Sequence, residues 1–236
     1  MIPSDPFDDG RASSSGRVAS ELVDSLSEHD KATLNDKRMV NDAIVEFDIK
    51  YNFALKSEVT RKMVTIFDPP FFRKLINCQK RMEDFAVLKH TDIFERDFVL
   101  MPVCHSMHWI LLIVWNPSGV FGYGECQILT FNSLSEMAGV DAIAFELVKK
   151  LFLAEGEKRG IKVMESRVRP VQIKCPQQPN GTDCGLFVGQ FADFFLDDLL
   201  TTVRLAIAGK LGGWFDPRVA CERRHKLRAL LKSLGK

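Results

Sequence analysis

The sequence has no continuous apolar segment long enough to cross a membrane. A membrane-spanning helix needs about 20 apolar residues, whereas the longest apolar run here is WILLIVW, from Trp109 to Trp115. This short run, rich in branched and aromatic side chains, is typical of a buried strand. We therefore expect no membrane partner.

Neither sign of charge dominates the composition. The 236 residues include 32 Lys and Arg against 31 Asp and Glu, which gives a formal net charge of +1. Nucleic-acid-binding domains usually carry a basic excess, so no nucleic-acid partner is expected. A chain of this length with 46% hydrophobic residues can form one sizeable core. We expect a monomer with a single folded domain plus tails.

Cysteine spacings that indicate a zinc site or a disulfide framework are also missing. The six cysteines are scattered, with no C-x-x-C pair: Cys78, Cys104, Cys126, Cys175, Cys184 and Cys221. We expect reduced thiols, and neither a metal nor another cofactor. The first residues, MIPSDPFDDG, show no secretory or myristoylation signal. The expected location is therefore intracellular, in the nucleus, the cytoplasm or both.

The chain divides into a short tail and one folded domain. Residues 1–30 are acidic and rich in Ser, Asp and Gly. Such a segment buries too little apolar surface to order itself alone. We therefore expect a disordered tail over residues 1–30 and a folded domain over residues 31–236.

Hydrophobic periodicity predicts helices towards both ends of the folded part and strands between them. Apolar residues at three- and four-residue spacing predict helices over 32–53 (with a start near Asn41), 67–76, 139–156, 185–200 and 218–236. Runs of branched and aromatic residues predict strands over 98–103, 109–115, 126–131 and 168–175. Helices around a central sheet indicate an α+β fold.

Two of these strands flank the turn segment NPSGVFGYGE and bring two polar residues together. If they form an antiparallel hairpin centred near Val120, paired residue numbers sum to about 240, which sets His108 opposite Asn132. A slip of two or three residues still leaves both side chains within reach. An amide oxygen that holds the imidazole Nδ1–H would fix the ring and present Nε2 for proton transfer.

Other interpretations of His108 stay open at this point. His105 lies in the connection before the strand and ranks lower as a reacting imidazole. Both histidines can instead be satisfied core or surface residues. A metal site built on Cys104 and His108 lacks a further cluster of Cys or His ligands, so the sequence disfavours it.

The segment QQPNGTDCGLF contains the strongest candidate for chemistry. Thr182 or Asp183 can cap a helix whose first turn holds Cys184, and a helix N-terminus or a nearby imidazolium favours a thiolate. Gly185 has no side chain to block an approaching substrate, and Gln178 offers an amide NH2 group.

Together these groups are the parts of an acyl-transfer site. They supply a thiolate, a base, an orienting amide, and oxyanion donors from the Gln178 side chain and the Cys184 backbone N–H. The alternative is that Cys184 is a small buried side chain at the start of an apolar helix, the usual role of a free cysteine. The residues alone leave both alternatives open.

Several motifs, in order along the chain, resemble those of the Ulp/SENP-type cysteine proteases, the family that matures and removes SUMO and related ubiquitin-like modifiers. The resemblance runs from about Leu34 to Leu234. Its motifs are MVNDAIVEF for an early W-L-N-D helix, FFRKL for the next helix, FERDFVLMPV for the strand before the active site, HWILLIV for the His-Trp strand, FNSL for the Asp-Ser-Leu position and CPQQPNGTDCGLFV for the Gln-to-Cys loop. The last motif is the most specific.

This resemblance implies a papain-like cysteine protease fold, with a central mixed or antiparallel sheet flanked by helices. It gives the nucleophile role to Cys184, the base and acid role to His108, the orienting role to Asn132 and the oxyanion role to Gln178. It also implies a narrow channel for the modifier's di-glycine tail, with Trp109 as one wall. The expected reaction is cleavage after that tail, in a precursor or at an isopeptide bond, with SUMO as the expected modifier.

Two residues depart from the family pattern. Asn132 stands where the family usually has Asp, and since an amide oxygen can still accept from the imidazolium, we expect an active but slower enzyme. Met39 stands where the family usually places the tryptophan of the second channel wall, although it can simply pack against the next helix. The alternatives are therefore a protease for another ubiquitin-like modifier or ubiquitin, or a weakly active pseudo-protease that binds a modifier.

Overall fold

The computed structural model describes residues 19–77, 93–122, 124–137 and 139–235. Its five-stranded sheet has the order β1-β2-β3-β4-β5. The strands are β1 (Val64–Ile66), β2 (Phe98–His105), β3 (His108–Trp115), β4 (Cys126–Phe131) and β5 (Val168–Ile173). β2, β3 and β4 pair antiparallel, whereas β1 and β5 are parallel to their neighbours. This mixed sheet with its helices confirms the predicted α+β class.

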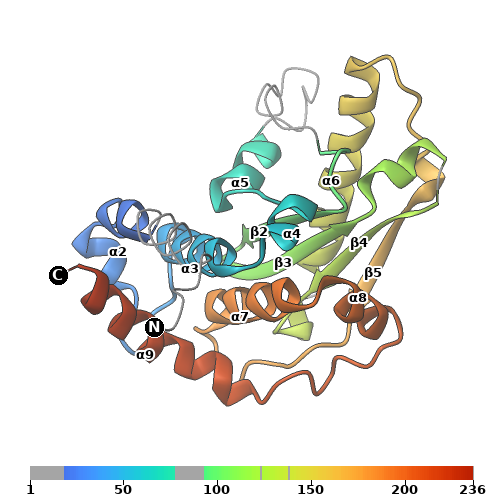
Figure 1. Ribbon diagram of the computed structural model, residues 1–236. Helices are drawn as coiled ribbons and strands as arrows, with labels where there is room; N and C mark the ends of the chain where they lie inside the picture. The colour runs from blue at the N-terminus through green and yellow to red at the C-terminus, as the bar shows by residue number, and fades with distance from the viewer. Residues whose placement is uncertain (1–18, 78–92, 123, 138, 236) are drawn as a thin grey trace, which may run out of the picture.

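Helices cover both faces of the sheet (Figure 1). On one side lie α5 (Pro69–Asn77) and α6 (Gly139–Lys158), and on the other lie α3 (Asp42–Leu55), α7 (Cys184–Asp197) and α8 (Leu199–Ile207), with α9 (Pro217–Leu234) packed outside α7. The short elements are α2 (Glu28–Ala32), α4 (Glu58–Met63), η3 (Pro117–Phe121), η4 (Ser135–Met137) and η5 (Glu165–Arg167).

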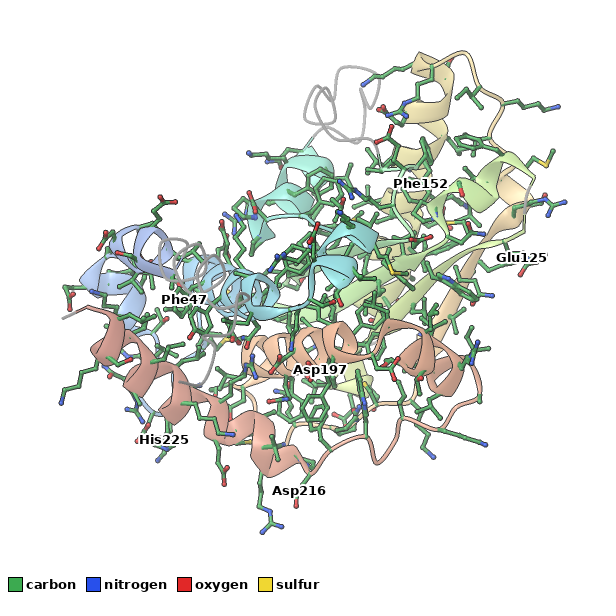
Figure 2. All side chains as sticks on the ribbon, viewed as in Figure 1. Phe47, Glu125, Phe152, Asp197, Asp216 and His225 are labelled. Carbon is green, nitrogen blue, oxygen red and sulfur yellow. The ribbon has the colours of Figure 1, made fainter. Side chains whose placement is uncertain are left out.

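The central strands are continuous apolar runs because both of their faces are buried. Alternate residues of a strand point to opposite faces. The face towards α7 receives Phe98, Leu100, Trp109, Leu111, Ile113, Leu129 and Phe131. The face towards α6 receives Val99, Met101, Val103, Ile110, Leu112, Val114 and Ile128. Figure 2 shows the two layers filled by side chains, with Phe47 in the first cluster and Phe152 of α6 in the second.

Most predicted elements are confirmed, and the differences lie at their ends. α3 begins at Asp42 because the Asn41 side chain accepts from the Ile44 N–H at 3.2 Å, so residues 32–40 precede that helix. α7 ends at Asp197 because Asp198 turns extended and caps α8. Strand β1, with three residues, and helix α4, with six, were not predicted because each is too short to show a clear period. Helix α8 was not predicted as a separate helix, because it follows α7 after the single residue Asp198.

The segment expected as a disordered tail is partly helical where the structure describes it. Residues 19–24 are helical, and Val23 and Leu26 are buried in the cluster beneath α7. Ser27 and Asp30 then form a reciprocal capping box at the start of α2. Within the described part of this segment, buried apolar side chains and a helix cap hold residues 19–30 against the domain. Residues 1–18, like Cys78, lie outside the described residues.

The β3–β4 hairpin forms with a register two residues from the expected one. Leu111 lies opposite Phe131, whereas the expected register set it opposite Leu129. A shift of two residues keeps every side chain on its predicted face, because the strand period is two. Asn132 directly follows the last paired residue of β4, and His108 begins β3, so the two remain at the same end of the sheet.

A buried ion pair joins α3 to α9 across α7. The Arg223 guanidinium donates to both Asp48 carboxylate oxygens at 2.6 and 2.8 Å, and both side chains are buried. Gly189 of α7 lies directly beneath the pair, where a Cβ would collide with the Asp48 carboxylate. The absence of a side chain at residue 189 thus makes room for the ion pair.

Gly189→Ala should lower the free energy of unfolding by about 1–3 kcal/mol, because the new methyl group must displace a buried, charge-paired carboxylate. Gly139→Ala, in a helix with open space around the glycine, is the matched control and should be neutral or slightly stabilising. Urea unfolding measures both. Equal stability of the two variants would contradict the close packing of α7 against Asp48.

Candidate active site

His108 and Asn132 meet at the end of the sheet, as the hairpin argument predicts. His108 follows a tight turn in which Ser106 and Met107 both have positive φ, 50° and 62°. Its Nε2 lies 2.8 Å from Asn132 Oδ1. Their exposed fractions are only 3% and 7%. His105 ends β2 opposite His108 and is the last residue of that strand, rather than part of a connection.

The hydrogen bonds of Asn132 decide which imidazole nitrogen is free. Asn132 Oδ1 also accepts from the Leu134 backbone N–H at 2.9 Å, and an N–H group can only donate, so this amide atom is the oxygen. His108 Nε2 must therefore carry the proton, which leaves Nδ1 as the acceptor of the neutral ring. The prediction that Asn132 holds Nδ1 and frees Nε2 is wrong, because the ring enters the pair through its other nitrogen.

A carboxylate lies behind the amide. Asn132 Nδ2 donates to Asp141 Oδ1 at 3.0 Å, and Asp141 Oδ2 accepts from Gln172 Nε2 at 3.3 Å. Burial raises the pKa of Asp141, while the hydrogen bond from Asn132, the charge of His108 and the hydrogen bond from Gln172 act in the opposite direction. His108, Asn132 and Asp141 thus form a buried row.

Gln178 is held beside this row by Ser133. The Ser133 hydroxyl donates to Gln178 Oε1 at 2.6 Å, and the Gln178 backbone N–H donates to the Ser133 carbonyl at 2.9 Å. Gln178 Nε2 donates one hydrogen to the Asn180 carbonyl at 2.6 Å, so its second hydrogen stays available. The amide is fixed with its NH2 end away from Ser133, which suits an oxyanion donor.

Cys184 is the first residue of α7 and has no exposed surface. Burial raises the pKa of its thiol, against hydrogen bonds to the sulfur from the backbone N–H groups of Trp109, Gly185 and Cys184 itself. The sulfur thus lies against the backbone of the residue that follows His108. A buried thiol of this kind needs a base to accept its proton before it can attack a carbonyl group.

The residue before Cys184 is locked by a buried arginine of α9. Asp183 occupies the N-cap position without a side-chain capping bond, and its Oδ1 accepts from Arg224 Nη2 at 2.6 Å. The same guanidinium donates to the carbonyls of Thr33, Asn35 and Arg38 at 2.7 to 3.1 Å. Arg224 thereby ties the loop before Cys184 to the segment that leads to Met39.

Trp109, Met39 and Gly185 lie around one small region. Trp109 Nε1 donates to the Val40 carbonyl at 3.2 Å, and half-buried Met39 packs on the same apolar cluster. Open space was expected beside Gly185, but a Cβ there would collide with Val40 and lie 3.3 Å from Trp109 Cδ1. The glycine therefore permits close packing of α7 against Trp109 and Val40.

Within the described ranges, no group of three or more His, Cys, Asp or Glu side chains is placed to hold a metal ion. Cys104, Cys126, Cys175, Cys184 and Cys221 are all free. No helix in the described part of the chain is both long and apolar enough to span a bilayer.

The site comprises a cysteine at a helix start, a histidine–amide pair and a glutamine, and all four residues lie within the range that matches one protease family. A model of the Ulp1 protease family, C-terminal catalytic domain, matches residues 38–220. The chain belongs to this family. The prediction of a Ulp/SENP-type cysteine protease is therefore confirmed at the level of family.

Curated relatives share the family with this chain. A probable ubiquitin-like-specific protease 2A of Arabidopsis thaliana is 26% identical over 89% of this chain and 30% of its own length. Sentrin-specific protease 5 of Mus musculus is 27% identical over 70% of this chain and 20% of its own length. The chain therefore spans less than a third of either relative.

Solved structures show the same fold. A de-sumoylating protease superposes with a TM-score of 0.80 at 24% identity, over 89% of this chain and 86% of that one. The C-terminal Ulp1 protease domain, solved in complex with SMT3, the yeast orthologue of SUMO, gives 0.61 at 19% identity over 100% and 98%. The predicted Ulp-type fold is confirmed.

Sequence reasoning missed three residues of this site. Ser133 stands in the FNSL motif, but the motif alone assigns it no role. Asp141 lies in the first turn of a predicted helix, a position where an acidic residue usually only interacts with the helix dipole. Arg224 lies on a basic terminal helix, whose charge pattern is typical of a solvated face.

Arg224→Met should lower the free energy of unfolding by about 3–5 kcal/mol, because it leaves Asp183 buried and unpaired. The control is Arg228→Met on the same helix, whose partner Asp36 is largely exposed and whose loss should cost less than about 1 kcal/mol. Both values come from urea unfolding at neutral pH. A similar loss in the two variants would contradict the anchoring role of Arg224.

The pH dependence gives a second check on the same pair. Burial acts to raise the pKa of Asp183, but the hydrogen bonds from Arg224 and Asn180 outweigh it, so the folded-state pKa is lowered. The stabilisation from this carboxylate is then complete above the unfolded pKa and is lost as the pH falls through the folded pKa. Arg224→Met should lose less stability on acidification than the wild type.

Proposed function

We propose that this chain cleaves the bond after the C-terminal di-glycine of a ubiquitin-like modifier, with SUMO as the first candidate. The protease domain would span residues 31–236 and act as a monomer in the nucleus, the cytoplasm or both. The observation that carries the proposal is the buried His108–Asn132 hydrogen bond at 2.8 Å, directly beside Trp109, whose backbone N–H contacts the Cys184 sulfur.

The chemistry follows from the donor and acceptor atoms that are available for a substrate. His108 Nδ1 takes the proton from the Cys184 thiol, and the sulfur attacks the carbonyl carbon of the second glycine. Gln178 Nε2–H and the Cys184 backbone N–H stabilise the oxyanion. The imidazolium then protonates the leaving amine as the C–N bond breaks. Water, activated by His108, hydrolyses the thioester and restores the thiol.

The residues that surround Cys184 indicate the substrate class. Trp109 and the segment at Met39 and Val40 lie against each other, and Cys184 has no exposed surface. An incoming chain must displace covering side chains and pass in an extended form, which suits residues without side chains, such as a glycine pair. The relatives' names refer to ubiquitin-like modifiers and sentrin, which makes SUMO the first modifier to test.

The direct test is covalent capture by a panel of modifiers that carry C-terminal electrophiles. Wild-type protein should form an adduct with a SUMO probe, and Cys184→Ala should form none because the attacking sulfur is gone. Cys126→Ala, which removes a buried thiol from the strand next to β3, is the control and should react like the wild type. Intact mass spectrometry measures the adducts.

Each other result of the capture experiment supports a different function. An adduct with ubiquitin or another modifier, but not with SUMO, would replace SUMO as the substrate, with Met39 as the first residue to examine. Binding of a modifier without an adduct would indicate a pseudo-protease. Neither binding nor adduct with any modifier would refute the proposed function while leaving the fold unaffected.

A further inference from the structure

The row behind His108 contains a carboxylate that the proposed reaction has not used. Asp141 lies in the first turn of α6, and only 8% of its surface is exposed. Asn132 Nδ2 donates to Asp141 Oδ1 at 3.0 Å, and Asn132 Oδ1 accepts from His108 Nε2 at 2.8 Å. A single amide therefore joins imidazole and carboxylate.

This amide has no freedom to turn. Its oxygen accepts from both His108 and the Leu134 N–H, and its nitrogen donates to Asp141. If the amide turned over, NH2 would face the Leu134 N–H and oxygen would face the Asp141 carboxylate, so both contacts would become repulsive. Asp141 thus selects the orientation in which Asn132 accepts from the ring.

We propose that Asp141 is a positioning residue of this active site, which acts through the Asn132 amide to orient His108 and to stabilise its positive charge. The inference rests on the proposed function, because the positive charge in question is the one that His108 gains when it takes the proton of Cys184. Asp141 then orients and stabilises the His108 ring through the Asn132 amide, whereas a carboxylate at residue 132 would contact the ring directly.

Two physical effects would allow Asp141 to stabilise the charged ring. A hydrogen-bonded chain in a buried site polarises its members, so a carboxylate on Nδ2–H makes Oδ1 a stronger acceptor for the ring. The negative charge also attracts the imidazolium through space, in a region shielded from water. Among the described residues, the titratable groups near the row include His105, which lies opposite His108, and Cys184, whose sulfur lies against the Trp109 backbone. Lys174 and Cys175 line a cavity of 380 Å³ beside Asp141.

A purely structural role for Asp141 makes a different prediction. An acidic residue in the first turn of a helix stabilises the helix through its dipole. Asp141→Asn would then reduce stability, but it would not change the ionisation of Cys184. Nor would a new carboxylate at residue 132 compensate for it.

The experiment follows the alkylation of Cys184 by iodoacetamide in the whole chain across a pH series, with the Cys184 peptide quantified by mass spectrometry. The pH at half-maximal rate reports thiolate formation and does not depend on how easily the reagent reaches the sulfur. Asp141→Asn should raise this midpoint by about one pH unit and lower the rate near neutral pH by about tenfold. Glu146→Gln, a charge removal on the exposed side of α6, should change neither.

The decisive variant exchanges the two side chains. Asn132→Asp combined with Asp141→Asn should return the midpoint to within about a few tenths of a unit of the wild type, since one carboxylate again serves the ring. Asn132→Asp alone is not the reference, because its new carboxylate would face the Asp141 carboxylate. If Asp141→Asn alone fails to fold, the exchanged variant still decides, because its new carboxylate at residue 132 should lower the midpoint below that of the wild type if Asp141 contributes nothing to the ring. Thermal unfolding of every variant separates ionisation from stability.

The outcomes separate this inference from the function on which it rests. A wild-type midpoint below that of an ordinary thiol, left unchanged by Asp141→Asn, would overturn the role of Asp141 and leave the protease proposal standing. Failure of the exchanged variant to recover, although folded, would overturn it as well. A wild-type midpoint no lower than that of a free thiol would refute both proposals.

Discussion

The hydrogen bond between His108 and Asn132 is the contact on which the rest of the site depends. It joins the first residue of β3 to the residue after β4, so it exists only if the hairpin forms in a register that puts both at one end of the sheet. From Asn132 the connections continue to Asp141 on α6. Through the adjacent Ser133 they continue to Gln178 in the loop before α7. One strand end therefore organises the three residues to which we give the roles of base, orienting group and oxyanion donor.

Burial of the site makes the formation of a charged thiolate unfavourable. The site lies between an apolar sheet and α7, and burial raises the pKa of the Cys184 thiol. The same low-polarity setting strengthens each charge and hydrogen bond once it is paired. Asp183–Arg224 and Asp48–Arg223 are two such pairs, and both tie α9 to the elements around Cys184. The terminal helix thus anchors the site although none of its residues belongs to the row at His108.

The sequence is most informative where periodicity decides the structure. The strands from residue 98 to residue 131 are predictable because buried strands carry branched and aromatic runs, and their hairpin alone predicts that His108 lies near Asn132. The register is two residues from the predicted one, which changes no face. Which ring nitrogen faces Asn132 could not be predicted in the same way, because it depends on how the His108 side chain is turned at the strand end, and the sequence carries no signal for that orientation.

Other parts of the site depend on contacts between distant segments. Asp141 and Arg224 act through residues 9 and 41 positions away, and neither spacing produces a pattern along the chain. The space beside Gly185 was expected to be open, but packing of α7 on Val40 fills it. Residues 19–30 were expected to be disordered from their composition, whereas Val23 and Leu26 are buried in the core cluster and Leu22 packs against it. The average composition of a segment does not show whether individual side chains are buried.

The central claim is that the His108 imidazole takes the proton from the buried Cys184 thiol. The most direct measurement is the ultraviolet absorbance of the thiolate as a function of pH, taken as the difference between the wild type and Cys184→Ser. The account predicts a thiolate that forms below the ordinary thiol range in the wild type and moves to markedly higher pH in His108→Gln. The claim would be contradicted if the wild type and His108→Gln formed the thiolate at the same pH.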